Sequence, residues 1–135
     1  MTPDEKCASE KPSDVGAVRA LIAYTTTPAE AQLDADTYYV RLDGQLVGTG
    51  AEIAAVNLQS GIWQRADGSY QDGRAWTGQT TLTTVGNATS TCNNWGSTAS
   101  ADGRVGWQSS ASQLFWSFTT QTCGSTSPRL YCVEQ

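Results

Sequence analysis

Four cysteines constrain this chain more than any other feature of its sequence. They are Cys7, Cys92, Cys123 and Cys132, separated by 85, 31 and 9 residues, and the chain contains no histidine. Structural zinc sites favour closely spaced cysteine pairs or added histidines, so these spacings favour disulfides over a bound metal. Disulfides persist in oxidising compartments, which predicts a secreted or surface-displayed protein.

The cysteines allow three pairings, and their spacing alone leaves all three open. The nested pairing, Cys7 with Cys132 and Cys92 with Cys123, is favoured because it joins the two chain ends and closes a Gly/Ser-rich segment. On the chain-entropy model these two loops would stabilise the fold by about 5 and about 3.5 kcal/mol. The strand-forming run at residues 130–133 would then be tied to the start of the chain.

Length and charge restrict the class of protein and its partners. The chain has 135 residues, which is typical of one domain, here residues 1–135, with a buried core. Its net charge is −5 and its basic residues are scattered singly, whereas nucleic-acid binding needs clustered Lys and Arg. No apolar run approaches the ~18 residues that span a bilayer. We therefore expect neither nucleic acid nor a membrane span.

Two helix starts and one buried strand are expected in the first quarter of the chain. Thr2 and Glu5 form a capping-box pattern that predicts a short helix over residues 4–10. Residues 17–24 are an apolar run whose length favours a buried strand over a helix. Residues 27–33 repeat the pattern of a capping residue followed by proline, which predicts a second short helix.

Strand and turn signals dominate from residue 37 onward. Residues 37–48 predict a hairpin, because two strand-like runs flank Asp43 and Gly44, a dipeptide that favours a type I′ turn. Residues 114–118, LFWSF, alternate in the manner of a strand. The remainder of the segment at 92–123 has few regular signals, and we expect a long irregular loop there, the kind of loop that is usually functional.

Several separated motifs resemble one family. WTG at 76–78, CNNW at 92–95, Cys123 and LYCVEQ at 130–135 follow one another in order, and YYVRLDGQLVG at 38–48 lies upstream. This pattern resembles the bacterial endostatin-like domains found in leptospiral and related collagen-like surface proteins. The resemblance extends from the first cysteine to the end of the chain.

The resemblance implies an α+β fold, a branch of the C-type lectin-like fold. Such a fold is mostly antiparallel β, with short N-terminal helices, a long loop region that carries the ligand surface, and two nested disulfides. Its N- and C-terminal strands lie side by side. Relatives have a strand before the first cysteine helix, whereas only six residues precede Cys7. We therefore expect that the chain either lacks its first strand or is cut from a longer surface protein.

Catalytic motifs are absent from the sequence. Without histidine the usual Ser/His and Cys/His nucleophile pairs cannot form, and no P-loop or Gly-x-Ser-x-Gly motif occurs. The motifs of calcium-dependent sugar binding in lectins are also missing. Asp67 and Asp72, in DGSYQDG, are calcium candidates because they place oxygen ligands close to glycines, although each Asp-Gly also predicts a turn. We expect no enzyme and no cofactor, with calcium as the alternative.

The expected ligand contacts lie in the segment at 101–110, ADGRVGWQSS. Trp107 offers a flat apolar surface, and Asp102, Arg104 and Gln108 offer hydrogen-bonding groups beside it. The alternative interpretation is that Trp107 packs the loop against the body of the domain.

These residues predict a non-enzymatic adhesion domain at the outer surface of a bacterium, binding a host, prey or matrix protein or a glycan. The alternative function is a structural or homotrimeric tip domain of a surface fibre, with no small ligand of its own.

Overall fold

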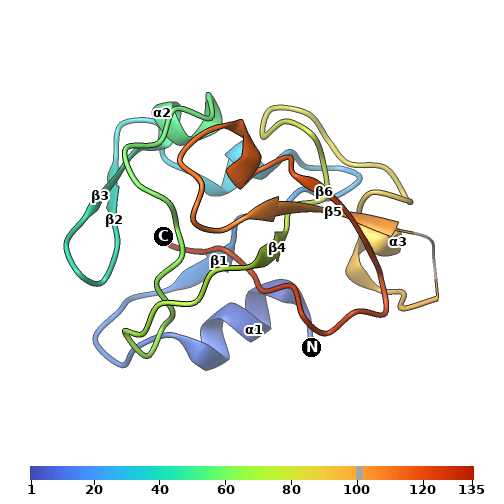
Figure 1. The fold of residues 1–135 in the computed structure, drawn as a ribbon, viewed down its shortest axis with the longest axis horizontal. Coiled ribbons are helices and arrows are strands. Elements are labelled where there is room, and N and C mark those ends of the chain that lie inside the picture. The colour runs from blue at the N-terminus through green and yellow to red at the C-terminus, as the bar shows by residue number, and fades with distance from the viewer. Residues whose placement is uncertain (100–101) are drawn as a thin grey trace.

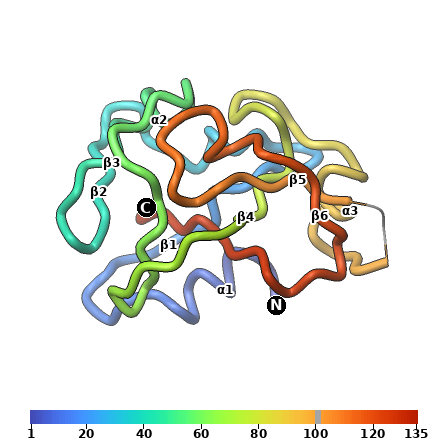
Figure 2. The backbone as a smooth tube through the Cα atoms, in the orientation of Figure 1, coloured from blue at the N-terminus to red at the C-terminus, as the bar shows by residue number. Residues whose placement is uncertain are grey.

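The two ends of the chain meet in a two-stranded antiparallel sheet. The computed structural model describes residues 1–99 and 102–135. In it β1 (Val18–Ala20) pairs with β7 (Cys132–Glu134), and Figures 1 and 2 show these strands side by side near the centre of the molecule. The Cys7–Cys132 disulfide links α1 (Pro3–Glu10) to β7. The expected terminal strand and its disulfide partner are therefore confirmed.

Helix α1 forms where the capping-box pattern predicts it. The backbone N–H of Glu5 donates to Thr2 Oγ1 over 3.2 Å, and the Thr2 N–H donates to Glu5 Oε2 over 2.6 Å. These two bonds satisfy N–H groups that lack partners inside the helix. Cys7 is the residue that α1 buries, and the helix is fixed both by the disulfide and by the Ala20 N–H, which donates to Asp4 Oδ1 over 2.9 Å.

The predicted second helix and hairpin are present, with one correction to the turn. The helix is a short 3₁₀ element, η1 (Ala29–Gln32), and the hairpin joins β2 (Tyr38–Val40) to β3 (Leu46–Thr49). A type I′ turn needs positive φ at both central residues. Gly44 meets this requirement with a φ of +84°, but Asp43 does not have a positive φ. The loop is instead a turn followed by a left-handed glycine. Helix α2 (Gly50–Ala54) follows directly.

A three-stranded antiparallel sheet forms the middle of the molecule. Its order is β4 (Arg74–Trp76), β5 (Asp102–Trp107), β6 (Thr119–Thr122), with β5 central. The sheet lies between the hairpin and helix α3 (Cys92–Trp95), as Figure 1 shows. Hence the architecture is mixed α/β with mostly antiparallel strands, held by two disulfides.

The expectation of a long irregular loop between Cys92 and Cys123 is wrong. The segment contains two of the three strands of the middle sheet, and the Cys92–Cys123 disulfide ties the beginning of the segment to the residue after β6. The predicted strand at 114–118 is also wrong. Phe115 and Trp116 are adjacent and both fully buried, which a strand with alternating faces does not allow, and η2 (Gln113–Phe115) forms there.

The buried residues form two clusters. The larger includes Trp116, Tyr131, Phe115, Leu21, Ile53 and Leu82, and the smaller consists of Cys7, Ala20 and Ile22. No helix in residues 1–99 or 102–135 is long and apolar enough to cross a bilayer.

Candidate functional site

One face of the middle sheet gathers aromatic and charged side chains that are far apart in sequence. Arg74 on β4 pairs directly with Trp107 on β5, and the ring of Phe118 lies 5.2 Å from that of Trp107. Residues directly opposite in an antiparallel pair point to the same face. By the same register Gln121 on β6 shares this face. We call the set the aromatic face: Asp72, Arg74, Trp107, Phe118 and Gln121.

Asp72 fixes the indole of Trp107. The Trp107 Nε1–H donates to Asp72 Oδ2 over 3.1 Å, and the Ser109 hydroxyl donates to the same oxygen over 2.8 Å. The backbone N–H groups of Ser109 and Gly73 donate to Asp72 Oδ1 over 3.1 and 2.9 Å. Four donors thus hold one carboxylate, and the carboxylate holds the ring in one orientation while Trp107 stays half-buried.

The donors around Asp72 keep it ionised. Desolvation would raise the pKa of Asp72, but the hydrogen bonds from Ser109, Gly73 and the indole outweigh it and hold that pKa below its ordinary value. Asp72 is therefore a structural anion at neutral pH.

This arrangement predicts a pH-dependent effect of Asp72→Asn. We expect the variant to have a lower melting temperature at pH 7, because its amide offers one acceptor oxygen where the carboxylate offers two. A carboxyl whose folded pKa is depressed contributes stability above its unfolded pKa, about 3.9, and loses it as the pH falls through the folded pKa. The difference from the unsubstituted protein should shrink below about pH 4.

Thermal unfolding followed by circular dichroism between about pH 3 and about pH 7 measures this difference. Asp14→Asn, at another exposed aspartate, is the control and should show a smaller difference at neutral pH. A deficit for Asp72→Asn that stays the same down to pH 3 would contradict the role assigned to its charge.

Arg74 and Phe118 complete the aromatic face. The guanidinium of Arg74 lies 5.8 Å from the centre of the Phe118 ring, and its Nη1 donates to Gln121 Oε1. Phe118 keeps 40% of its surface exposed, which leaves its ring available to a partner molecule. A flat apolar surface with hydrogen-bonding groups at its rim suits recognition rather than bond-making.

The structure separates the four predicted ligand contacts. Trp107 lies on the aromatic face, whereas Gln108 is buried and donates to Arg74 O over 3.1 Å, so Gln108 is a structural residue. Arg104 points to the opposite face of the sheet, and its Nη2 donates to Ser117 Oγ over 2.6 Å. Asp102 is exposed at the start of β5, on the Arg104 face. Strand alternation therefore splits a set that the sequence groups together.

The calcium candidates have other roles. Asp67 closes a turn, since the Ser69 N–H and hydroxyl both donate to its Oδ1, and Asp72 holds Trp107. No group of three or more metal-ligating side chains occurs within residues 1–99 and 102–135.

A second aromatic cluster adjoins the site and was not predicted from the sequence. The rings of Trp63 and Tyr70 lie 5.1 Å apart, and the Tyr70 hydroxyl donates to Asp43 Oδ2 over 2.7 Å. Asp43 also pairs with Arg41 over 2.7 Å. The two clusters are joined through the backbone, because Gln71 N–H donates to Trp63 O and Gln71 precedes Asp72. The signal available in the sequence is the pair of aromatics around an Asp-Gly turn.

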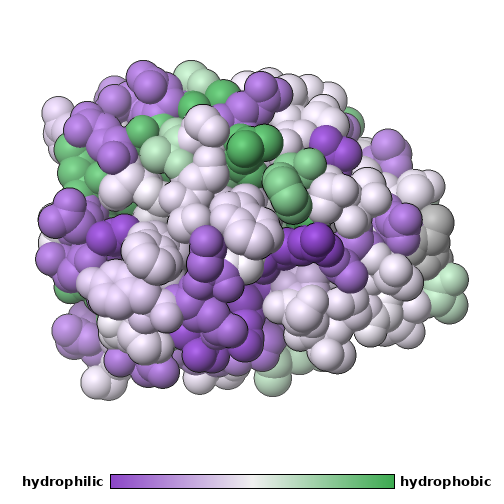
Figure 3. All heavy atoms as spheres, viewed as in Figure 1, coloured by the Kyte–Doolittle hydropathy of each residue, from purple (hydrophilic) through white to green (hydrophobic). Residues whose placement is uncertain are grey.

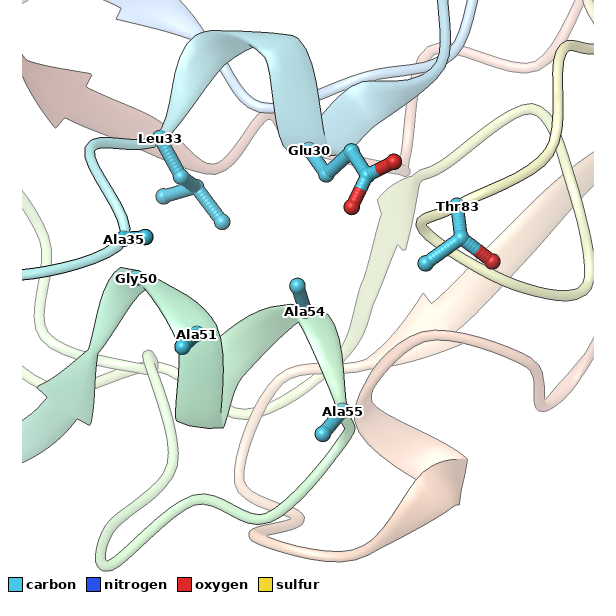
Figure 4. A pocket seen from close by; sticks show the side chains of 8 residues that line it. All are labelled: Glu30, Leu33, Ala35, Gly50, Ala51, Ala54, Ala55 and Thr83. Atoms are coloured by element: carbon cyan, nitrogen blue, oxygen red, sulfur yellow. The ribbon is translucent and has the colours of Figure 1, made fainter.

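Figure 3 shows one face of the molecule, on which hydrophilic and near-neutral side chains dominate and most hydrophobic ones lie in the upper half. Two surface hollows add no convergent chemistry. One, of about 340 Å³, lies between η1 and α2 (Figure 4), and Glu30 is its one ionisable group. The rest of its lining is small or apolar apart from Thr83: Leu33, Ala35, Gly50, Ala51, Ala54 and Ala55.

The other hollow, of about 530 Å³, lies between the first turn of α1 and helix α3. Asp4 and Tyr24 are its ionisable side chains, and Asp4 Oδ1 already accepts the Ala20 N–H over 2.9 Å. Burial, followed by the charge of Asp4, raises the pKa of Tyr24, so that hydroxyl stays protonated. Neither hollow pairs a nucleophile with a base.

Comparisons with protein-family models, with curated proteins and with solved structures find no match to this chain.

Proposed function

We propose that this protein is an extracellular binding domain that recognises a protein or glycan through the aromatic face and catalyses no reaction. The single observation that carries this proposal is the Trp107–Phe118 ring pair, partly exposed and fixed by Asp72 and Arg74. Fixed aromatic rings lose little conformational entropy on binding, which favours them as contact residues.

The proposal includes an endostatin-like, C-type lectin-like fold and a place at the outer surface of a bacterium. Two features support it: the nested disulfides and the pairing of β1 with β7. Two disulfides also favour an oxidising compartment.

Replacement of Trp107 tests the proposal. We expect Trp107→Ala to weaken ligand binding about 30-fold, as the loss of a central aromatic contact usually does. Its melting temperature should fall much less than that of a core variant, because Trp107 is only half-buried. The ligand is first identified on a glycan array run beside a panel of matrix proteins, with and without calcium.

Trp63→Ala is the matched control, since Trp63 is also half-buried and also stacks on one aromatic ring. If Trp107→Ala still binds the ligand and Trp63→Ala does not, the ligand binds the second aromatic cluster instead. Equal binding by both variants and the unsubstituted domain would refute the aromatic face as the binding surface.

A structural role in a surface fibre is the second candidate, and one observation favours it. Tyr38, Val40 and Leu42 are 70%, 60% and 51% exposed, on and just after the outer strand of a two-stranded sheet. Exposed apolar edge strands invite pairing with another chain. Light scattering that shows a stable trimer would support this role, and a monomer at micromolar concentration would exclude it.

A further inference from the structure

Among the residues that the structure describes, no arginine near the middle sheet forms an ion pair with a carboxylate, although the protein is acidic. Of the ion pairs within residues 1–99 and 102–135, one joins Lys6 to Glu10 and the other joins Arg41 to Asp43. Arg74 bonds instead to the neutral amide oxygen of Gln121. With 13 acidic residues against 8 basic ones, an unpaired arginine beside an aromatic pair calls for a physical explanation.

The carboxylate nearest to Arg74 in sequence is not available to it. Asp72 lies two residues away, and its oxygens already accept from Trp107, Ser109 and Gly73. The surface therefore holds an anion, Asp72, that fixes the ring, and a cation, Arg74, that forms no ion pair with any described residue.

A second arginine lies next to the first along the neighbouring chain segment. The Arg129 N–H donates to Arg74 O over 2.9 Å, and Arg129 is exposed. Its Nη2 approaches Gln71 Oε1 at 3.5 Å, again a neutral amide oxygen. Both arginines thus donate to neutral amide oxygens. A ligand carboxylate in the same place would bind the arginines more strongly, because hydrogen bonds between two charged groups are roughly twice as strong as those between neutral groups.

We propose that the ligand of the aromatic face is an acidic sugar, whose carboxylate binds Arg74 while its ring packs on Trp107 and Phe118. This inference rests on the proposed binding function and names its ligand class. Arginine presents a planar fork that matches a carboxylate, and the C–H faces of a sugar ring suit a half-buried indole with one open side.

The neutral polar side chains around the face favour a sugar over an acidic peptide. Thr119 and Gln121 share the face of Trp107 by register, and the Ser109 hydroxyl bonds to the carboxylate that holds the indole. None of these three residues carries charge. Such groups can both donate and accept, as a hydroxyl-rich ligand requires. Uronic and sialic acids share this chemistry, so the test separates them.

Two polymers with the same sugar backbone, one with free carboxylates and one with methyl esters, provide the test. Polygalacturonate carries a carboxylate on each ring, and its fully methyl-esterified form keeps the ring without the charge. We expect the intact domain to bind polygalacturonate or polysialic acid in calorimetric titration, and the esterified polymer to bind roughly tenfold more weakly than polygalacturonate if the sugar is a uronic acid. Binding should also weaken with added salt. Preference for one acidic polymer identifies the source of the carboxylate.

Arg74→Gln should lower affinity for the acidic polymer roughly tenfold, because the amide cannot neutralise the carboxylate. Arg19→Gln, at an exposed arginine on β1, is the matched control and should leave affinity unchanged. Unchanged binding by Arg74→Gln, equal binding of the esterified polymer, or no binding to either acidic polymer overturns the inference. A ligand that depends on Trp107 but not on Arg74 would leave the proposed binding function standing.

Discussion

The double substitution Cys7→Ala and Cys132→Ala should lower the free energy of unfolding by about 5 kcal/mol. The disulfide spans 125 residues, so its loss frees nearly the whole chain in the unfolded state. It also fixes α1 to β7, and Cys7 is the residue that α1 buries. Domains of this size are stable by about 5–15 kcal/mol, so the variant should be marginal or unfolded at 37 °C.

Urea denaturation followed by tryptophan fluorescence measures the loss. The matched control is the double substitution Cys92→Ala and Cys123→Ala, whose loop spans 31 residues and should cost about 3.5 kcal/mol. A larger loss from the shorter loop would show that loop length does not govern stability here. In that case the local structure of the Cys92 segment, and not the length of the loop, would determine how much stability is lost.

Gly106→Ala should cost about 3 kcal/mol through overpacking. A Cβ at position 106 would lie 1.7 Å from Phe115 O and 3.0 Å from Trp116 Cα, both backbone atoms. Phe115 O cannot move away freely, because it accepts the buried Tyr131 hydroxyl over 2.7 Å. The central strand and η2 would have to separate, and the aromatic face would lose its support.

The melting temperature of Gly106→Ala measures this cost, and Gly96→Ala is the control. A Cβ at position 96 would lie 3.4 Å from Asn93 O, an ordinary contact distance, and the φ of Gly96 is −104°, which any residue adopts. The control should melt within a few degrees of the unsubstituted protein. If Gly106→Ala is equally mild, η2 does not pack on β5 as closely as described.

Local signals in the sequence predicted local structure well. The Thr2–Glu5 capping box acts within one helical turn, so the start of α1 follows from the residues alone. The hairpin also follows from a short pattern, but its turn type does not, because Asp43 bonds to Arg41, Gln45 and Tyr70 and adopts no left-handed conformation.

Conformations that depend on tertiary contacts could not be predicted. Four consecutive residues, Cys92–Trp95, have φ values between +49° and +65°, although left-handed conformations are unfavourable for residues other than glycine. The disulfide of Cys92, the Trp95 Nε1–H bond to Ala23 O and the Thr25 N–H bond to Asn94 Oδ1 stabilise this turn. These contacts are made with residues far away in sequence, so no local sequence pattern predicts the turn.

Only part of the candidate site was predicted, because the rest depends on contacts between strands that are distant in sequence. Trp107 stood out in a polar segment, but Arg74 and Phe118 become its neighbours only when β4, β5 and β6 pair. Gln108 looked equivalent to Trp107 in sequence, yet strand alternation directs it inward.

The most direct test of the binding account is the response of the five indole N–H resonances to saturating ligand in a nitrogen–proton correlation spectrum. We expect the Trp107 resonance to shift, because its N–H lies on the aromatic face, and the Trp116 resonance, from the buried core, to stay in place. Substitution of Trp107 identifies its signal. An unmoved Trp107 resonance, with shifts confined to the hairpin residues Tyr38 and Val40, would contradict the account and place the ligand on the β2 edge.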